Sequence, residues 1–383
     1  MMNLDFDDIR SYNDDEYKTV IKELLEVQPL IQTIQNYLPE YSVEDLKKIL
    51  LSFEKIQDFQ SKMVCKFVDR IIKSSIKNFS YDGILRLDKH NSYLLISNHR
   101  DIVLDSALIN YCLNDRQYNT SEIAIGSNLL SKPWIRKLVR LNKSFIVKRN
   151  VPKDELLEAS KKLSAYINYT LKNKKQSVWI AQREGRAKDG FDKTNPGLLK
   201  MFGMAAEDSL LDHLKSLNIT PVTLSYELDP CDYLKIPELL NKSEGIAYVK
   251  AEGEDDKHML LGMQGNKGSV HVQFGSPIND EIEKFRSIKN KNELLKNVAE
   301  VIDKRIYKNY KLWSSNYVAY DLLTNTNKYI GNYTLDERLQ FIDYMVNRLK
   351  YFLKNKKAEQ LFLEMYANPV FNMEKALNNF PDE

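Results

Sequence analysis

Long apolar runs, glycine and proline are all scarce in this 383-residue chain. No stretch reaches the roughly 18 uninterrupted apolar residues that a membrane-spanning helix requires, so we expect no transmembrane segment. Gly and Pro number 13 and 11, which favours long regular elements over a loop-rich fold. Residues 1–16 are acidic and lack an apolar core, unlike a signal peptide. We therefore expect a cytoplasmic protein, in which any membrane contact is peripheral and made from the cytoplasmic face.

Cysteine is also scarce, and the charges nearly balance. Cys65, Cys112 and Cys231 are widely spaced and form no C-x-x-C pair, which favours free thiols in a reducing compartment. The formal net charge is only +3, so no general basic field indicates nucleic-acid binding. Hydrophobic residues make up 43% and charged residues 28%. This composition is typical of a globular protein.

Apolar periodicity divides the chain into three parts. Residues 1–78 repeat apolar side chains at helical spacing, and Ser42 with Asp45 marks one helix start. Residues 79–280 alternate short apolar runs with helix-length segments, which is typical of an α/β sheet. Residues 281–383 return to helical spacing. We predict an α/β catalytic domain with a central mixed sheet flanked by helices, and helical extensions at both ends.

Seven short apolar runs in the middle part have the length of buried strands. They are 84–87, 93–97, 123–126, 145–148, 178–181, 220–226 and 270–274. Helix-length segments between them are 105–113, 134–141 and 152–172. We interpret the acidic run 252–256 as a solvated loop.

One of the five histidines stands where an α/β fold binds ligands. His99 directly follows the run 93–97, and residues just past the carboxyl end of a strand lie at the ligand-binding edge of such sheets. A nearby carboxylate, Asp101 or Asp105, can fix the imidazole tautomer and stabilise its charged form, as a general base requires. A lone His near an Asp is often structural, so this pattern needs further support.

The other four histidines have no partner at metal-ligand spacing, and we assign no metal. They are His90, His213, which we place in a helix, His258, in a charged loop, and His271, on a strand.

Cations follow two further predicted strands. The run 144–149 ends in Lys148 and Arg149, and the strand 178–181 leads into a glycine-containing turn with Arg183, Arg186 and Lys188. Because Arg can bind a phosphate through two hydrogen bonds, these clusters suit an anionic ligand. Either cluster alone also fits a solvated loop.

The order of these segments resembles the glycerophosphate and lysophosphatidate acyltransferase superfamily, whose members carry four ordered sequence blocks. The resemblance covers roughly residues 80 to 280. The residues that match the blocks in order are Asn98, His99 and Arg100 through Asp105, then 145–149, then Glu184-Gly185-Arg186, then Pro221 in its apolar strand.

The resemblance implies a reaction and a set of roles. In that family the His deprotonates an acceptor hydroxyl, which attacks an acyl thioester, while the Asp orients the His. It implies no bound cofactor, with the thioester of CoA or of acyl carrier protein as co-substrate. Implied roles are catalysis for His99 and Asp105, acceptor-phosphate binding for Arg149, Glu184, Gly185 and Arg186, and support for Asn98, Arg100, Asp101, Lys148 and Pro221.

The sequence departs from the family pattern twice. Five residues separate His99 from Asp105 where the family usually has four, so a bulge, a later helix start or a role for Asp101 remains open. Arg183 replaces the Pro that often precedes Glu184. The longer segment that follows is similar to the glycerol-3-phosphate branch.

The favoured acceptor is 1-acylglycerol 3-phosphate, with glycerol 3-phosphate or a lyso-aminolipid as alternatives within the class. A hydrolase is disfavoured because the sequence has no G-x-S-x-G motif. A membrane-binding protein with a degenerate site is a further alternative, which the extra residue after His99 favours and the intact blocks disfavour.

The segment 129–141 is our predicted membrane-docking helix. Trp134, Ile135, Leu138 and Leu141 share one face at helical spacing, and Arg136, Lys137 and Arg140 fall on the other side. Such a helix suits an anionic lipid surface, and it equally suits packing on the sheet.

Overall fold

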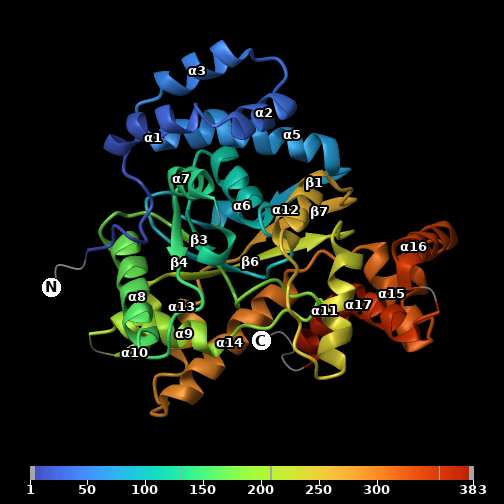
Figure 1. The fold of residues 1–383 in the computed structure, drawn as a ribbon. Coiled ribbons are helices and arrows are strands. Elements are labelled where there is room, and N and C mark those ends of the chain that lie inside the picture. Colours follow the sequence, from blue (N-terminus) through green and yellow to red (C-terminus); the bar gives the residue numbers. More distant parts are fainter. Residues whose placement is uncertain (1–4, 131, 208, 353, 379–383) are drawn as a thin grey trace.

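The computed structural model describes residues 5–130, 132–207, 209–352 and 354–378. Ser131 of the predicted docking segment, the first four residues and the last five lie outside these ranges. Figure 1 shows a central sheet, N-terminal helices above it, and a group of C-terminal helices at its right-hand end.

The sheet has seven strands in the order β1-β7-β6-β2-β5-β3-β4. Neighbouring strands are parallel except β6 and β7, which are antiparallel, so the predicted mixed sheet is confirmed. The strands are β1 (Asn78–Asp82), β2 (Leu94–Ser97), β3 (Glu122–Gly126), β4 (Ser144–Val147), β5 (Val178–Ala181), β6 (Ile219–Tyr226) and β7 (Ser269–Phe274).

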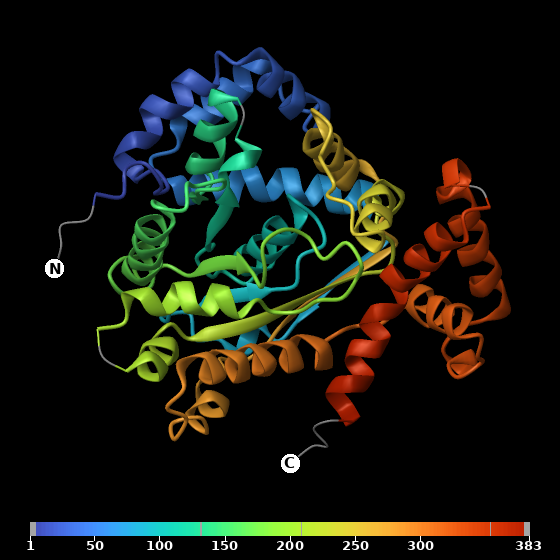
Figure 2. The same cartoon turned by 60° about the horizontal axis from the view of Figure 1, so that its bottom comes forward.

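Helices cover both faces of the sheet and form the two extensions (Figure 2). Before the sheet lie α1 (Tyr17–Leu24), α2 (Gln28–Tyr37), α3 (Val43–Ser52), α4 (Ile56–Phe59) and α5 (Cys65–Ser75). Between the strands lie α6 (Leu104–Asp115), α7 (Pro133–Leu141), α8 (Leu156–Lys172), α9 (Pro196–Phe202), α10 (Leu210–Ser216), α11 (Asp232–Ser243) and α12 (Glu254–Gln264). After the last strand lie α13 (Asn279–Glu283), α14 (Lys291–Lys308), α15 (Ser314–Thr324), α16 (Leu335–Arg348) and α17 (Lys356–Asn378).

Strand β2 shows how one apolar run serves both faces of the sheet. Leu94 and Ile96 belong to the core that includes residues of α8 and α14, and Leu95 belongs to the core beneath α5 and α6. Successive side chains of a strand point to opposite faces, so a strand covered on both sides is continuously apolar. Because helices cover both faces, β2 leaves the core at the carboxyl edge of the sheet. His99 follows β2 at this edge, beside a cavity.

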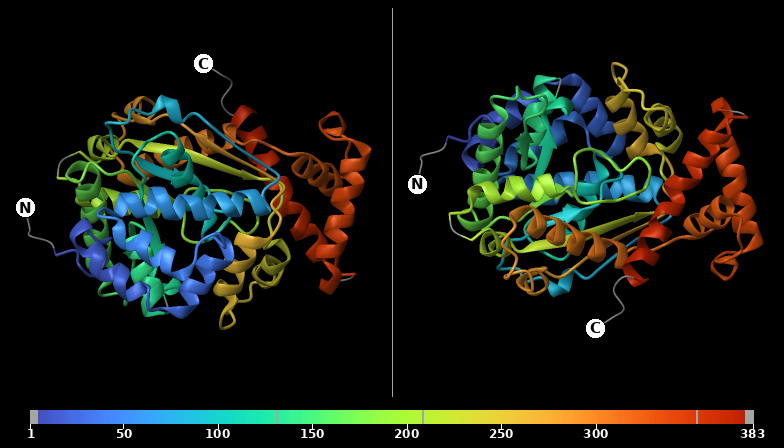
Figure 3. Two further views of the ribbon diagram at one scale, coloured as in Figure 1. Left: turned by 90° about the horizontal axis from the view of Figure 1, so that it is seen from above. Right: turned by 90° about the horizontal axis from the view of Figure 1, so that it is seen from below.

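The extensions have cores of their own. In the N-terminal helices, the Ser42 hydroxyl accepts a hydrogen bond from the Asp45 N–H at 3.0 Å, as the predicted helix start requires. The C-terminal helices α15 and α16 pack around α17, which also contacts α11 and α14 (Figure 3). Among the described residues, no helix combines the length and the apolar composition needed to cross a membrane.

The prediction of a strand at 84–87 is wrong. Ile84–Arg86 is a 3-10 helix, and the edge strand is β1, in the preceding residues. Ile84 and Leu87 are buried while Leu85 is 76% exposed, so the burial repeats every three residues and suits a helical turn. Gly83 follows β1 and has φ +81°, and a Cβ there would lie 2.0 Å from the Phe274 carbonyl oxygen.

The prediction of a solvated loop at 252–256 is wrong for most of that run. Gly253, with φ +73°, precedes α12, and Glu254, Asp255 and Asp256 form its first turn. Negative charges are favourable there because they face the positive end of the helix dipole. His258, predicted to lie in a charged loop, is therefore a buried residue of α12.

Candidate active site

His99 and Asp105 are in direct contact at the carboxyl end of β2. Nδ1 of His99 lies 2.8 Å from Oδ2 of Asp105, whose side chain is fully buried. Asp105 Oδ2 also accepts hydrogen bonds from the backbone N–H groups of Arg100 and Asp101, at 2.6 and 3.0 Å. Because the carboxylate accepts and His99 donates from Nδ1, Nε2 is left as the proton acceptor.

The extra residue between His99 and Asp105 is absorbed by a turn. Helix α6 begins at Leu104, so Asp105 lies in its first turn. The side chain of Asp101 accepts hydrogen bonds from the N–H groups of Val103 and Leu104, at 2.9 and 2.8 Å, and so holds this turn. Of the two carboxylates considered from the sequence, Asp105 is the one that contacts His99.

Asn98 and Pro221 connect the end of β2 to β6. Asn98 Nδ2 donates to the Leu224 carbonyl oxygen at 2.9 Å, and its Oδ1 accepts from the Leu224 N–H at 2.8 Å. Pro221 is paired in register with Ile96, and its carbonyl oxygen accepts a hydrogen bond from the Gly275 N–H. Both residues are buried, so they hold the strands that carry the site.

Arg100 points away from the cavity that His99 lines. Its Nη2 lies 2.7 Å from Oδ2 of the buried Asp192, which also accepts a hydrogen bond from Tyr310 at 2.6 Å. This ion pair is enclosed, and through Tyr310 it connects the residue after His99 to the segment that follows α14.

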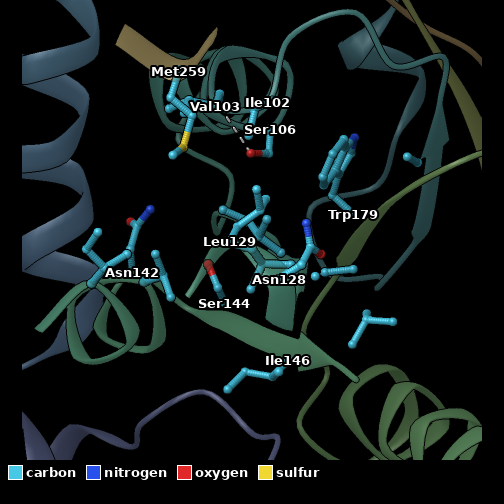
Figure 4. Close-up of a pocket in the computed structure, with 18 of the residues that line it drawn as sticks. Ile102, Val103, Ser106, Asn128, Leu129, Asn142, Ser144, Ile146, Trp179 and Met259 are labelled. Atoms are coloured by element: carbon cyan, nitrogen blue, oxygen red, sulfur yellow. Dashed lines mark hydrogen bonds between the residues drawn. The ribbon is translucent and has the colours of Figure 1, made fainter. Parts of the chain in front are cut away.

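A large, mainly apolar cavity of 1390 Å³ opens beside His99. In Figure 4, Met259, Ile102 and Val103 stand on one side of it, and Ser144 and Ile146 of β4 lie opposite. Its lining extends beneath the N-terminal helices, where it includes Leu30, Ile34, Leu38, Phe67 and Val68. Predicted site residues that line it are His99, Lys148, Arg149, Glu184, Gly185 and Arg186.

The two predicted phosphate-binding arginines reach the cavity from different strand ends. Arg149 follows β4, and its Nη1 lies 2.8 Å from Oε1 of Glu184, which is 71% exposed. Arg186 follows β5 and is only 8% exposed. Lys148, beside Arg149, pairs with Asp8 at 2.6 Å.

The turn that carries Arg186 is tied directly to His99. Gly185 has φ +69°, which favours glycine, and no atom lies within 4 Å of where its Cβ would stand. The Ala187 N–H then donates to the His99 carbonyl oxygen at 3.0 Å. The cationic turn and the His are thus held in one local unit.

Several residues of the site were not predicted. The Tyr226 hydroxyl donates to Asp105 Oδ1 at 2.8 Å, and the ring of Trp179 meets the His99 ring edge to face, with 5.9 Å between centroids. Tyr226 ends a predicted strand, so its position was a usable signal. Lys188, which was predicted from the sequence to lie in a cationic turn suited to an anionic ligand, also lines the cavity, and burial and the Arg186 charge lower its pKa to about 8.

No group of three or more His, Cys, Asp or Glu side chains suited to a metal ion occurs within the described ranges. The groups that converge on the site are a His–carboxylate pair, arginines and an apolar cavity.

Residues 78–225 match the family model described as Acyltransferase. The chain therefore contains a domain of this family and is an acyltransferase, as its resemblance to the glycerophospholipid acyltransferases predicted. The matched range contains His99, Asp105, Arg149, Arg186 and Pro221. A comparison with curated proteins finds no match.

Two solved structures are similar at a low level. One is the 1-acyl-sn-glycerophosphate (LPA) acyltransferase PlsC from Thermotoga maritima, with a TM-score of 0.36 and 12% identity over 76% of this chain and 97% of that chain. The other is the signal recognition particle 54 kDa protein of Aeropyrum pernix K1 in complex with GDP, with a TM-score of 0.22 and 10% identity over 91% of this chain and 81% of that chain.

Proposed function

We propose that this acyltransferase transfers an acyl chain from a thioester to a hydroxyl of a glycerophosphate-type acceptor, with His99 as the general base. The observation that carries the proposal is the convergence of the His99–Asp105 pair, Arg149 and Arg186 on one apolar cavity. The favoured acceptor is 1-acylglycerol 3-phosphate, in phospholipid synthesis.

In the proposed reaction, His99 Nε2 takes the proton of the acceptor hydroxyl as its oxygen attacks the thioester carbonyl carbon. Asp105 stabilises the imidazolium that forms. The tetrahedral intermediate then collapses, the carbon–sulfur bond breaks, and His99 returns the proton to the leaving sulfur. The products are the ester and the free thiol, and no acyl-enzyme forms.

The phosphate of the acceptor is assigned to Arg149 and Arg186. The exposed carboxylate of Glu184 holds Arg149 only weakly, because an ion pair in contact with water contributes little. A phosphate dianion can therefore replace it. A cavity of 1390 Å³ exceeds the roughly 300–1,000 Å³ of typical small-ligand pockets, which supports substrates with acyl chains.

We assign membrane contact to the opening of the cavity rather than to α7. Leu156 and Leu260 both line the cavity and are 53% and 51% exposed, so they stand at its opening. An apolar rim with a lipid-sized cavity behind it suits a bilayer surface.

The cations of α7 that were predicted to attract anionic lipid make contacts within the protein. Arg136 donates to the Asp8 carbonyl oxygen, Lys137 pairs with Glu23, and Arg140 donates to the carbonyl oxygens of Arg10 and Asp7. The apolar side chains Trp134 and Leu138 pack on the N-terminal helical core. These contacts attach the N-terminal extension to the sheet domain.

The test is product formation by the purified enzyme with acyl-CoA and with acyl-acyl carrier protein. The acceptors are 1-acylglycerol 3-phosphate, glycerol 3-phosphate and a lyso-aminolipid. Phosphatidate formation supports the proposal, and the other products identify the alternative acceptors. Release of fatty acid without acceptor indicates a hydrolase, and no thioester consumption with any acceptor indicates a membrane-binding protein.

A further inference from the structure

Helix α12 lies between β6 and β7 in the sequence. It contacts both the turn after His99 and the turn that carries Arg186. A Cβ on Gly262 would lie 2.1 Å from Asp101 Oδ2, so the helix backbone closely approaches the turn after His99. His258 lies four residues before Gly262 and therefore on the same helix face. Met259 and Met263, on the adjacent face, line the cavity.

His258 is in direct contact with Arg186. Its Nδ1 lies 2.6 Å from Nη2 of Arg186, and the two residues are 2% and 8% exposed. A guanidinium only donates hydrogen bonds, so Nδ1 of His258 must be unprotonated. Burial, together with the Arg186 charge, lowers the pKa of His258 to about 4. The ring is therefore neutral at pH 7.

We propose that His258 is the positioning residue of the acceptor site, where it holds the Arg186 guanidinium toward the acceptor phosphate. Arg186 lines the cavity and His258 does not, so His258 acts through the arginine. The inference rests on the proposed function, and it adds a residue outside the four sequence blocks. Within the described ranges this is the one hydrogen bond recorded for the Arg186 side chain, which leaves further N–H groups for a phosphate.

An uncharged hydrogen-bond acceptor beside Arg186 has a specific advantage. The carboxylate of Glu184 competes with phosphate for Arg149, but a neutral imidazole fixes Arg186 without cancelling its charge. Because Arg186 is buried, a carboxylate in place of His258 would pair with it strongly and weaken its attraction for phosphate. The role therefore requires an uncharged hydrogen-bond acceptor, which predicts opposite effects for Asn and Asp.

The experiment measures initial rates at saturating acyl-CoA while 1-acylglycerol 3-phosphate is varied. The variants are His258→Leu, His258→Asn and His258→Asp in the full chain. His258→Leu removes the nitrogen that accepts the hydrogen bond from Arg186. This change should raise KM for 1-acylglycerol 3-phosphate about tenfold, with kcat within about twofold of wild type. His258→Asn should stay close to wild type, because Asn Oδ1 takes the place of Nδ1. His258→Asp should raise KM well above His258→Asn.

His213→Asn is the matched control. His213 is also a buried helical histidine, and its Nε2 bonds to the Phe202 carbonyl oxygen at 3.0 Å away from the cavity lining. Its substitution should change thermal stability without changing the KM for the acceptor.

A folded His258→Leu with the wild-type KM would overturn the inference. So would equal KM values for His258→Asn and His258→Asp, and this pair decides the question if His258→Leu does not fold. A wild-type enzyme that uses only glycerol 3-phosphate is tested in the same way with that acceptor. A wild-type enzyme that transfers to no phosphate-bearing acceptor overturns the proposed function and, with it, this inference, whatever the variants do.

Discussion

The carboxylate of Asp105 contacts Nδ1 of His99 at 2.8 Å and receives a hydrogen bond from the Tyr226 hydroxyl at the same distance. Two backbone N–H groups also donate to it. Every described partner of this carboxylate is therefore a donor. The arrangement fixes the orientation of the imidazole and favours its protonated form during the reaction.

Asp105→Asn should lower kcat by at least about a hundredfold. An amide has one acceptor oxygen, so its NH₂ group would face one of the donors that now meet the carboxylate. The measurement is kcat at saturating substrates, with circular dichroism to confirm folding.

Asp101→Asn is the matched control for that change. Asp101 accepts hydrogen bonds from the N–H groups of Val103 and Leu104 through Oδ1, and Asn retains such an oxygen. We expect kcat within about fivefold of wild type, because both of these hydrogen bonds are retained and each contributes only about 1 kcal/mol. If Asp101→Asn alone is inactive, the orienting role belongs to Asp101.

Arg149→Ala and Arg186→Ala should each raise KM for the acceptor by about tenfold to a hundredfold. A charge-assisted hydrogen bond to phosphate contributes roughly 1.5–3 kcal/mol. Arg70→Ala is the control, since Arg70 pairs with Glu40 on the surface much as Arg149 pairs with Glu184, but does not line the cavity. Unchanged saturation curves in both arginine variants would favour an acceptor without phosphate.

Asp303→Asn should stabilise the fold at pH 7. Burial raises the pKa of Asp303 to about 6, from an ordinary value of 3.8. The folded state thus binds this proton more tightly than the unfolded state, so the contribution of Asp303 to stability falls as pH rises from about 4 to 6.

Asn keeps the oxygen that accepts the Thr194 N–H and carries no charge. The gain in free energy of unfolding at pH 7 should be about 1–3 kcal/mol, since one pKa unit corresponds to about 1.4 kcal/mol. Urea unfolding at pH 4 and pH 7 measures it. An equal gain at both pH values would show that the charge of Asp303 is not its cause.

Membrane contact at the cavity opening predicts that Leu157→Glu combined with Val249→Glu abolishes sedimentation with anionic vesicles. These residues are 53% and 85% exposed and adjoin the cavity-lining Leu156 and Lys250 in sequence, without lining the cavity themselves. Burial of each apolar side chain in lipid is worth roughly 1.5–3 kcal/mol, so the partition coefficient should fall more than tenfold.

Leu85→Glu controls for this change, since Leu85 is 76% exposed and does not line the cavity. Reversing Arg136, Lys137 and Arg140 is a poorer test, because these side chains contact the N-terminal segment. If the double variant sediments like wild type, docking occurs elsewhere on the surface.

The sequence predicted the fold class and the residues that converge on the cavity for one physical reason. His99, Arg149 and Arg186 each follow a predicted strand, and the carboxyl ends of parallel strands meet at one edge of a sheet. The apolar runs placed each of these side chains just past a strand end, and the family resemblance assigned them to one site. The edge strand β1 was missed because N-F-S-Y-D is half polar, as an edge strand often is.

The contact between Arg186 and His258 was beyond sequence reasoning. The two residues are separated by 72 positions, and the acidic residues before His258 suggested a loop rather than the first turn of α12. The resemblance assigned the orienting role to Asp105, but the spacing left Asp101 open, because an extra residue near a helix start moves later side chains by about 100° unless a turn absorbs it. Here the turn held by Asp101 absorbs it.

If His99 is the base for acyl transfer, His99→Ala must form product far more slowly than the wild type. The assay follows phosphatidate formed from acyl-CoA and 1-acylglycerol 3-phosphate, with thermal unfolding of wild type and variant measured in parallel. We expect kcat to fall at least about a hundredfold with the fold retained, because general-base catalysis typically contributes that much. A folded His99→Ala enzyme that forms phosphatidate at nearly the wild-type rate would contradict it.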